Sequence, residues 1–293
     1  MGTSGSSSGS GSGTPLVPSW LGGGDSGDLP GGDAPSTPDG SDGGEDQGSP
    51  QSPESSQKPP IPPIAAPERF RSARTNFSRF AGSGGSDGRA LKRAVRDYVR
   101  SGTGGSANAV RRMGIARSAA SNALGVFRGI QRYGMQETLR RLNLQSFAGR
   151  PIQDIFVGLT EVICQDGGTI DEAITRDAWL ETIASFEQFD IVDSDALSAD
   201  QIQEVFLSFV AHTIEARLYQ EIAVNGFKFS EDLQDIEGFD KQFRDYIERS
   251  VRDSFASDLG EMADFSDKEI RNIVDKTYLD TWNLLETLGD REG

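Results

Sequence analysis

The sequence predicts an all-α fold, a helical bundle preceded by a long disordered N-terminal arm that is rich in glycine, serine and proline. Two observations predict it. From residue 69 onward, apolar side chains recur at three- and four-residue steps, the spacing of one helix face, and strand-like alternation is scarce. Residues 1–67 instead hold 15 of the 35 glycines and 12 of the 13 prolines, with too little apolar surface to offset the entropy lost on ordering.

Charge divides the chain further. Residues 1–67 hold eight acidic residues and one basic residue, residues 68–150 hold four and 17, and residues 151–293 hold 33 and 11. We therefore expect four segments: an N-terminal recognition and modification motif at 1–21, an acidic proline-rich linker at 22–67, a basic helical region at 68–150 and an acidic helical domain at 151–293.

The basic region is expected to form three successive helices. Aromatic and small apolar residues from Phe70 to Phe80 recur at helical spacing, and the glycine-rich stretch at 82–88 ends that segment. A second helix carries Leu91, Val95 and Val99 on one face. A third is predicted at residues 107–127, after another glycine hinge.

The acidic region contains the clearer helix signals. An apolar run at 152–163 stops at a glycine pair, and a further helix is expected around residues 239–251. Three capping boxes, in which a hydroxyl side chain precedes an acid or amide by three residues, predict helix starts at Thr169, Ser198 and Ser266.

The scarcity of some residue types excludes several classes of protein and of functional site. No apolar run approaches the ~20 residues of a membrane helix and no secretory signal is evident, which predicts a cytoplasmic protein. The lone Cys164 and the lone His212 lie in apolar helical patterns and are expected to be structural. Asp193, Asp195 and Glu204 match only part of a calcium loop. We predict no metal, no cofactor and no catalytic residue.

The basic region at 68–150, and within it a basic face at residues 92–112, has two interpretations. Clustered arginines and lysines neutralise phosphates, so the region can be a nucleic-acid-binding module. No helix-turn-helix, zinc-finger or RNA-binding signature accompanies it, and an acidic surface, on a partner or on the acidic half of this chain, is the favoured contact. The residues of this face are Lys92, Arg93, Arg96, Arg100, Arg111 and Arg112.

The N-terminus carries a different kind of chemistry. Small Gly2 permits removal of Met1, and the exposed α-amine has a pKa of ~7.7 to 8, so part of it is neutral and nucleophilic near pH 7. The alternative is that Gly2 is merely a common second residue. Beyond it lie the residues we expect to thread into or dock on a partner: Thr3, Ser4, Pro15, Leu16, Val17, Pro18 and Trp20.

Short motifs shared with one bacterial family are spread from the N-terminus to residue 173. They are Met1-Gly2-Thr3-Ser4, Thr14-Pro15-Leu16-Val17-Pro18-Ser19-Trp20, Arg69-Phe70, Phe80-Ala81-Gly82-Ser83-Gly84, Tyr98-Val99, Gly104-Gly105, Arg111-Arg112-Met113 and Cys164-Gln165-Asp166-Gly167-Gly168-Thr169-Ile170-Asp171-Glu172-Ala173. In these motifs the chain resembles the QatB family, the B component of the Qat anti-phage defence system. The resemblance covers the arm and most of residues 68–190 and skips the linker.

The resemblance implies a non-enzymatic adaptor subunit. Its expected partners are a QueC-like enzyme (QatC), an ATPase (QatA) and a TatD-like nuclease (QatD), with no membrane. It also implies that the QueC-like enzyme uses ATP to couple a deazaguanine carboxylate to the N-terminal glycine, here Gly2.

Overall fold

The computed structural model describes residues 68–164, 168–189, 191, 197–223, 233–257, 259–260 and 262–290. These residues form helices and connecting turns and contain no strand, which confirms the predicted all-α fold. The predicted arm at 1–67 lies outside the described residues.

The basic region folds into helices that end at its glycines. α1 (Arg71–Gly82) and α2 (Gly88–Asp97) pack side by side, and the Asp87 carboxylate caps α2 by accepting from the Ala90 amide. In the turn between them Gly85 has φ of +83° and lies so close to α10 that a Cβ would sit 2.7 Å from the Gly238 oxygen, so only glycine fits. A π-helix, η2 (Tyr98–Thr103), α3 (Ser106–Arg112), α4 (Gly114–Tyr133) and α5 (Met135–Arg141) follow.

Two predicted helix boundaries differ from the structure. The helix expected at 107–127 is divided at Met113, whose φ and ψ of −92° and 23° leave the helical range just before Gly114. The second predicted helix changes to a π-helix at Tyr98. Tyr98 and Met113, one at each of these boundaries, are both buried. Tertiary packing therefore determines helix boundaries that the apolar periodicity alone does not mark.

All three predicted capping boxes are confirmed. Thr169, Ser198 and Ser266 each accept from the backbone amide three residues later, and the acid or amide side chain at that position reaches back to the cap. The helices of this region are α6 (Ile152–Gly158), α7 (Thr160–Ile163), α8 (Ile170–Ala184), α9 (Ala199–Leu218), the π-helix η5 (Tyr219–Ala223), α10 (Leu233–Ser254) and α11 (Asp267–Leu288), with short 3-10 turns η3 (Gln145–Phe147), η4 (Phe186–Phe189) and η6 (Met262–Asp264).

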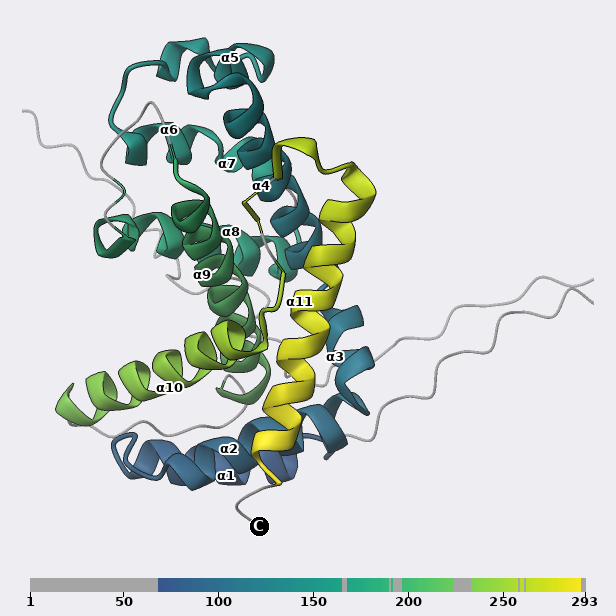
Figure 1. The fold of residues 1–293 in the computed structure, drawn as a ribbon. Helices are drawn as coiled ribbons and strands as arrows, with labels where there is room; N and C mark the ends of the chain where they lie inside the picture. Colours follow the sequence, from purple (N-terminus) through teal and green to yellow (C-terminus); the bar gives the residue numbers. More distant parts are fainter. Residues whose placement is uncertain are drawn as a thin grey trace, which may run out of the picture. The chain divides into compact units, whose positions relative to one another are not determined.

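Helices from the basic and acidic regions share one hydrophobic core. α11 runs beside α3 and α4, and α1 lies against α10 (Figure 1). The Tyr98 ring stacks 5.7 Å from the Trp282 ring, and the Phe77 ring meets the Phe239 ring edge-on at 5.4 Å. The two regions therefore bury their apolar faces against each other.

Candidate functional site

The N-terminal residues that we predicted to be modified or to bind a partner lie outside the described residues. They are Gly2, Thr3, Ser4, Pro15, Leu16, Val17, Pro18 and Trp20. Their roles stay predictions.

The basic face at 92–112 lies largely against carboxylates of the same chain. Arg100 Nη2 is 2.6 Å from Asp290 Oδ2, just beyond the C-terminus of α11, and its Nε is 3.4 Å from Glu286 Oε1. The hydrogen bonds that Arg100 donates to Asp290 and Glu286 raise the pKa of its guanidinium. Arg96 pairs with Asp97 at 2.8 Å and donates to the Gly289 carbonyl at 3.3 Å. Cations at this place also complement the negative end of the α11 dipole.

Arg112 is part of a buried ionic cluster. Its Nη2 lies 2.7 Å from Glu221 Oε1, and Arg217 Nη1 lies 3.2 Å from the same oxygen. The Tyr98 hydroxyl donates to Glu221 Oε2 at 3.2 Å, and burial, followed by the charge of Glu221, raises the pKa of Tyr98. Burial lowers the pKa of Arg112, but the hydrogen bond and charge of Glu221 more than offset it, and the net shift is upward.

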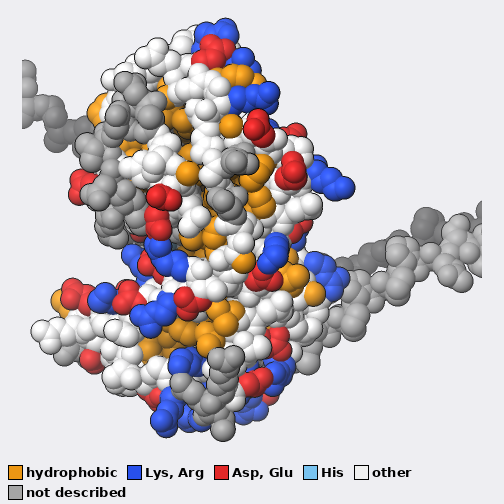
Figure 2. Space-filling view, in the orientation of Figure 1, with side chains coloured by type: hydrophobic (Ala, Val, Ile, Leu, Met, Phe, Trp, Pro, Cys, Tyr) orange, Lys and Arg blue, Asp and Glu red, His pale blue; other side chains and the backbone are white. Residues whose placement is uncertain are grey.

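The remaining three residues of the basic face differ from one another in exposure. Arg111 is exposed and donates to Asn108, whereas Lys92 and Arg93 are half-buried on α2 and also interact within the chain. The six residues therefore do not form one free phosphate-binding surface, and the arginines that reach furthest across the fold meet acidic residues of η5, of α11 and just beyond α11. On the face of the molecule shown in Figure 2, basic and acidic side chains likewise lie next to one another.

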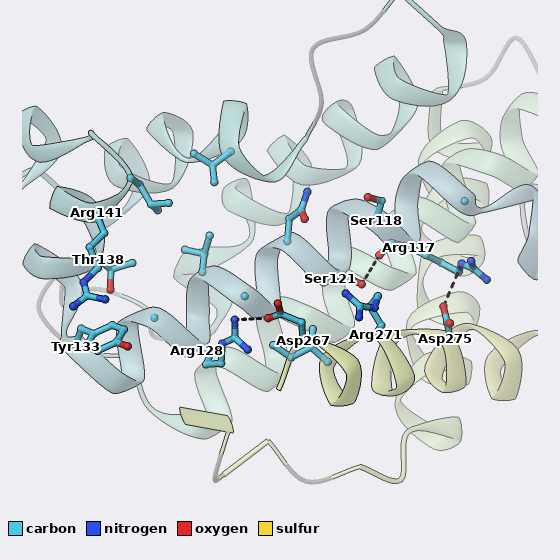
Figure 3. A pocket seen from close by; sticks show the side chains of 18 residues that line it. Arg117, Ser118, Ser121, Arg128, Tyr133, Thr138, Arg141, Asp267, Arg271 and Asp275 are labelled. Carbon is cyan, nitrogen blue, oxygen red and sulfur yellow. Dashed lines mark hydrogen bonds and ion pairs between the residues drawn. The ribbon is translucent and has the colours of Figure 1, made fainter. Parts of the chain in front are cut away.

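A groove along α4 was not predicted from the sequence. Its volume is about 640 Å³, its floor is α4, and its walls are the first half of α11 on one side and α5 on the other (Figure 3). Small residues form the floor, and guanidinium groups from α4, α5 and α11 stand at its edges. The floor residues are Gly114, Ser118, Ser121, Gly125 and Gly129.

Charged side chains are fixed at intervals along this groove. Arg128 Nη2 lies 2.7 Å from Asp267 and its Nη1 donates to the Phe265 carbonyl at 2.7 Å. Arg117 Nε lies 3.5 Å from Asp275. Arg271 extends from α11 toward α4 and forms no ion pair with any residue that the structure describes.

The far end of the groove carries an aromatic ring. The Arg141 guanidinium carbon lies 3.7 Å from the Tyr133 ring centroid, a cation–π contact. Arg141 is also held by Glu137 at 2.8 Å. Hydrogen bonds from Arg140 and then from Arg141 lower the pKa of Glu137 to about 2. The available signal in the sequence was the recurrence of small residues at three- and four-residue steps from 114 to 129.

Cys164 and His212 are buried, as expected for structural residues. Burial raises the pKa of the Cys164 thiol to about 12 and, with the charge of Arg244, lowers the pKa of His212 to about 4. His212 Nδ1 lies 3.1 Å from the Thr182 hydroxyl. Of the partial calcium loop, Asp193 and Asp195 lie outside the described residues, and Glu204 pairs with Arg252 at 2.6 Å.

The described residues contain neither a metal-binding cluster nor a membrane-spanning helix. Across these residues, no group of three His, Cys, Asp or Glu side chains is placed to hold a metal ion. None of the described helices combines the length and the apolar character needed to span a bilayer.

Comparison with known proteins identifies the family. The model of the family described as Qat anti-phage system associated protein QatB matches residues 104–285, more than half of the chain. The chain belongs to the QatB family. The match runs from the loop before α3 into α11, so it includes the groove and the charged residues of the Glu221 cluster, but not Tyr98, and it extends beyond the 68–190 resemblance. No curated protein and no solved structure matches.

Proposed function

We propose that this QatB-family chain is a non-catalytic adaptor and substrate subunit of a Qat anti-phage complex. Its helical part is the carrier, and its N-terminal glycine, Gly2, is the group that is modified after Met1 is removed. The observation that carries the proposal is the Met1-Gly2-Thr3-Ser4 start, joined to a chain whose residues 104–285 match the family.

The proposed reaction is amide formation at the Gly2 nitrogen. A QueC-like partner activates the carboxylate of a deazaguanine with ATP, and the neutral α-amine attacks the activated carboxyl carbon. The carbon–nitrogen bond forms, the ATP-derived activating group leaves, and the amine loses a proton. A terminal amine suits this role because its pKa of ~7.7 to 8 lies far below the ~10.4 of lysine.

In this proposal the N-terminal arm docks the chain on its partner proteins. Pro15 and Pro18 restrict their neighbours to extended conformations, which lowers the entropy lost on binding, and Trp20 provides a large side chain of the kind that dominates interface energies. The proposed partners are the QueC-like enzyme, the ATPase and, as a further component, the TatD-like nuclease, in an intracellular complex.

The test is mass spectrometry of the full chain produced from the whole operon. We expect the N-terminal peptide to have lost Met1 and gained a nucleobase-sized mass, and Gly2→Pro to abolish that gain. Gly5→Pro, the same substitution within the glycine-serine run, is the matched control and should keep the added mass. An unmodified Gly2 from an operon that still protects cells against phage would refute the proposal.

A further inference from the structure

We propose that the groove along α4 is a docking site for an extended acidic segment of another protein. This inference goes beyond the modification of Gly2 and does not depend on it. It rests on the shape of the groove, on its excess of donors and on the charge of its walls.

Above the middle of the groove floor there is free space, at a glycine that the packing of the fold does not require. An added Cβ at Gly125, in the interior of α4, would meet no heavy atom within 4 Å. At Gly129, in contrast, the Cβ would lie 3.1 Å from Thr138 Cγ2, so internal packing explains that glycine. A glycine inside a helix costs about 0.5–1 kcal/mol relative to alanine. Gly125 therefore leaves the middle of the floor open to a ligand that approaches α4 from outside.

The length of the floor fits a short peptide. Gly114 and Gly129 are 15 residues apart on α4, roughly 22 Å at a rise of 1.5 Å per residue. An extended chain rises about 3.3 Å per residue, so about seven peptide residues would cover this distance.

The donors in the groove favour carboxylates. The groove is lined by four arginines, Arg117, Arg128, Arg141 and Arg271, and by two acids, Asp267 and Asp275, in a chain whose net charge is −16. Arg271 has no ionic partner among the described residues, and the buried Arg117 Nε, 3.5 Å from Asp275, makes no hydrogen bond. Guanidinium groups bind carboxylates through paired, charge-assisted hydrogen bonds, which makes an acidic peptide complementary to this surface.

Two features favour a peptide over a nucleic acid. Asp267 and Asp275 lie in the wall and repel any anion, but a nucleic acid carries a charge at every phosphate, whereas a peptide can place neutral residues beside the aspartates and its carboxylates at the arginines. Single-stranded nucleic acids also need aromatic faces on which bases stack, and the one aromatic ring of the groove, Tyr133, is already covered by Arg141.

The experiment is fluorescence anisotropy on the full chain with a labelled eight-residue peptide of alternating glutamate and glycine. We expect binding that weakens several-fold between 50 and 300 mM salt, roughly as screening of exposed charges predicts. Arg271→Ala should weaken binding several-fold and Gly125→Leu at least about tenfold, because leucine fills the open floor. Gly82→Leu is the matched control, since Gly82 is also a helical glycine with open space around it but lies on α1, and it should bind normally.

Further measurements keep the outcome unambiguous. Thermal unfolding should show that Gly125→Leu is folded, and Gly2→Pro should leave binding unchanged, which separates this inference from the proposed function. The eight acids at 25–54 can compete with the peptide, so each titration is repeated on a full chain with these acids changed to Asn and Gln. The proposal is overturned by no binding in either background, by equal binding of a lysine-glycine peptide, or by tighter Gly125-dependent binding of an eight-residue oligothymidylate.

Discussion

Arg112 and Glu221 are 109 residues apart in the chain, yet Arg112 Nη2 lies 2.7 Å from Glu221 Oε1. The contact joins the basic region to the acidic region inside the fold. Arg217 and Tyr98 complete the cluster around the same carboxylate, which is only 8% exposed. Glu221 thus neutralises charge from two arginines on different helices.

Glu221→Gln should strongly destabilise the protein. The substitution keeps the shape of the side chain but leaves Arg112 without its buried carboxylate and Arg217 with Asp171 alone, whose Oδ2 lies 2.8 Å from Arg217 Nη2, and breaking a buried ionic contact costs about 3 kcal/mol. Urea unfolding followed by circular dichroism measures the change. Arg111→Ala, next to Arg112 but exposed, is the control and should change the free energy of unfolding by less than about 0.5 kcal/mol.

Ser266→Ala should weaken the start of α11. The Ser266 hydroxyl accepts from the Glu269 amide, and loss of such a cap costs about 1 kcal/mol. Ser266→Asp retains an acceptor and favours the positive end of the helix dipole, so its unfolding midpoint should stay near that of the wild type. Equal losses for both substitutions would show that the cap itself contributes nothing.

Glu215 should make stability decrease as pH rises. Burial raises its pKa from 4.5 to about 7, while Arg244, whose Nε lies 3.5 Å away, opposes that shift. Below pH 4.5 the group is protonated in both states. Between 4.5 and about 7 only the unfolded chain ionises it, so the free energy of unfolding falls, by on the order of 3 kcal/mol in total.

Glu215→Gln should remove this decrease, which urea titrations at pH 4, 5, 6, 7 and 8 would show. Arg244→Gln should extend the decrease to higher pH, because the cation that lowers the folded-state pKa of Glu215 is lost. A pH dependence unchanged by Glu215→Gln would contradict the assignment.

Cys164 should be inert in the native protein. The side chain is 1% exposed and burial raises its thiol pKa to about 12, so almost no thiolate is present at pH 8. A chromogenic disulfide reagent should release no colour within an hour from the folded chain and one equivalent in 8 M urea. Rapid labelling of the folded chain would show that the segment around Cys164 opens readily.

Local sequence signals predicted the helix boundaries that depend on residues close together in the chain. The three capping boxes each involve residues three positions apart, and all three begin helices as expected. The break at Met113 was not predicted, because it depends on the core into which Met113 is buried.

Contacts between residues that are distant in the sequence could not be predicted from local patterns. The charge imbalance indicated that basic residues would meet an acidic surface, but no local pattern selects Glu221 or Asp290 among 33 acids. The groove was missed for the same reason. Glycines and serines along α4 are visible in the sequence, whereas the walls that turn them into a floor come from α11 and α5.

The stacking of Tyr98 on Trp282 has a consequence for how the protein is made. The two rings belong to helices at opposite ends of the described chain, as do Arg100 and Asp290, which are 190 residues apart. At about 5–20 residues per second, a ribosome needs roughly 10–40 s to travel that distance. During that time the apolar faces of the early helices have no α11 to cover them. A nascent chain therefore completes its core only when its last helix emerges, and a ribosome that stalls before α11 leaves an incomplete product for chaperones or proteases.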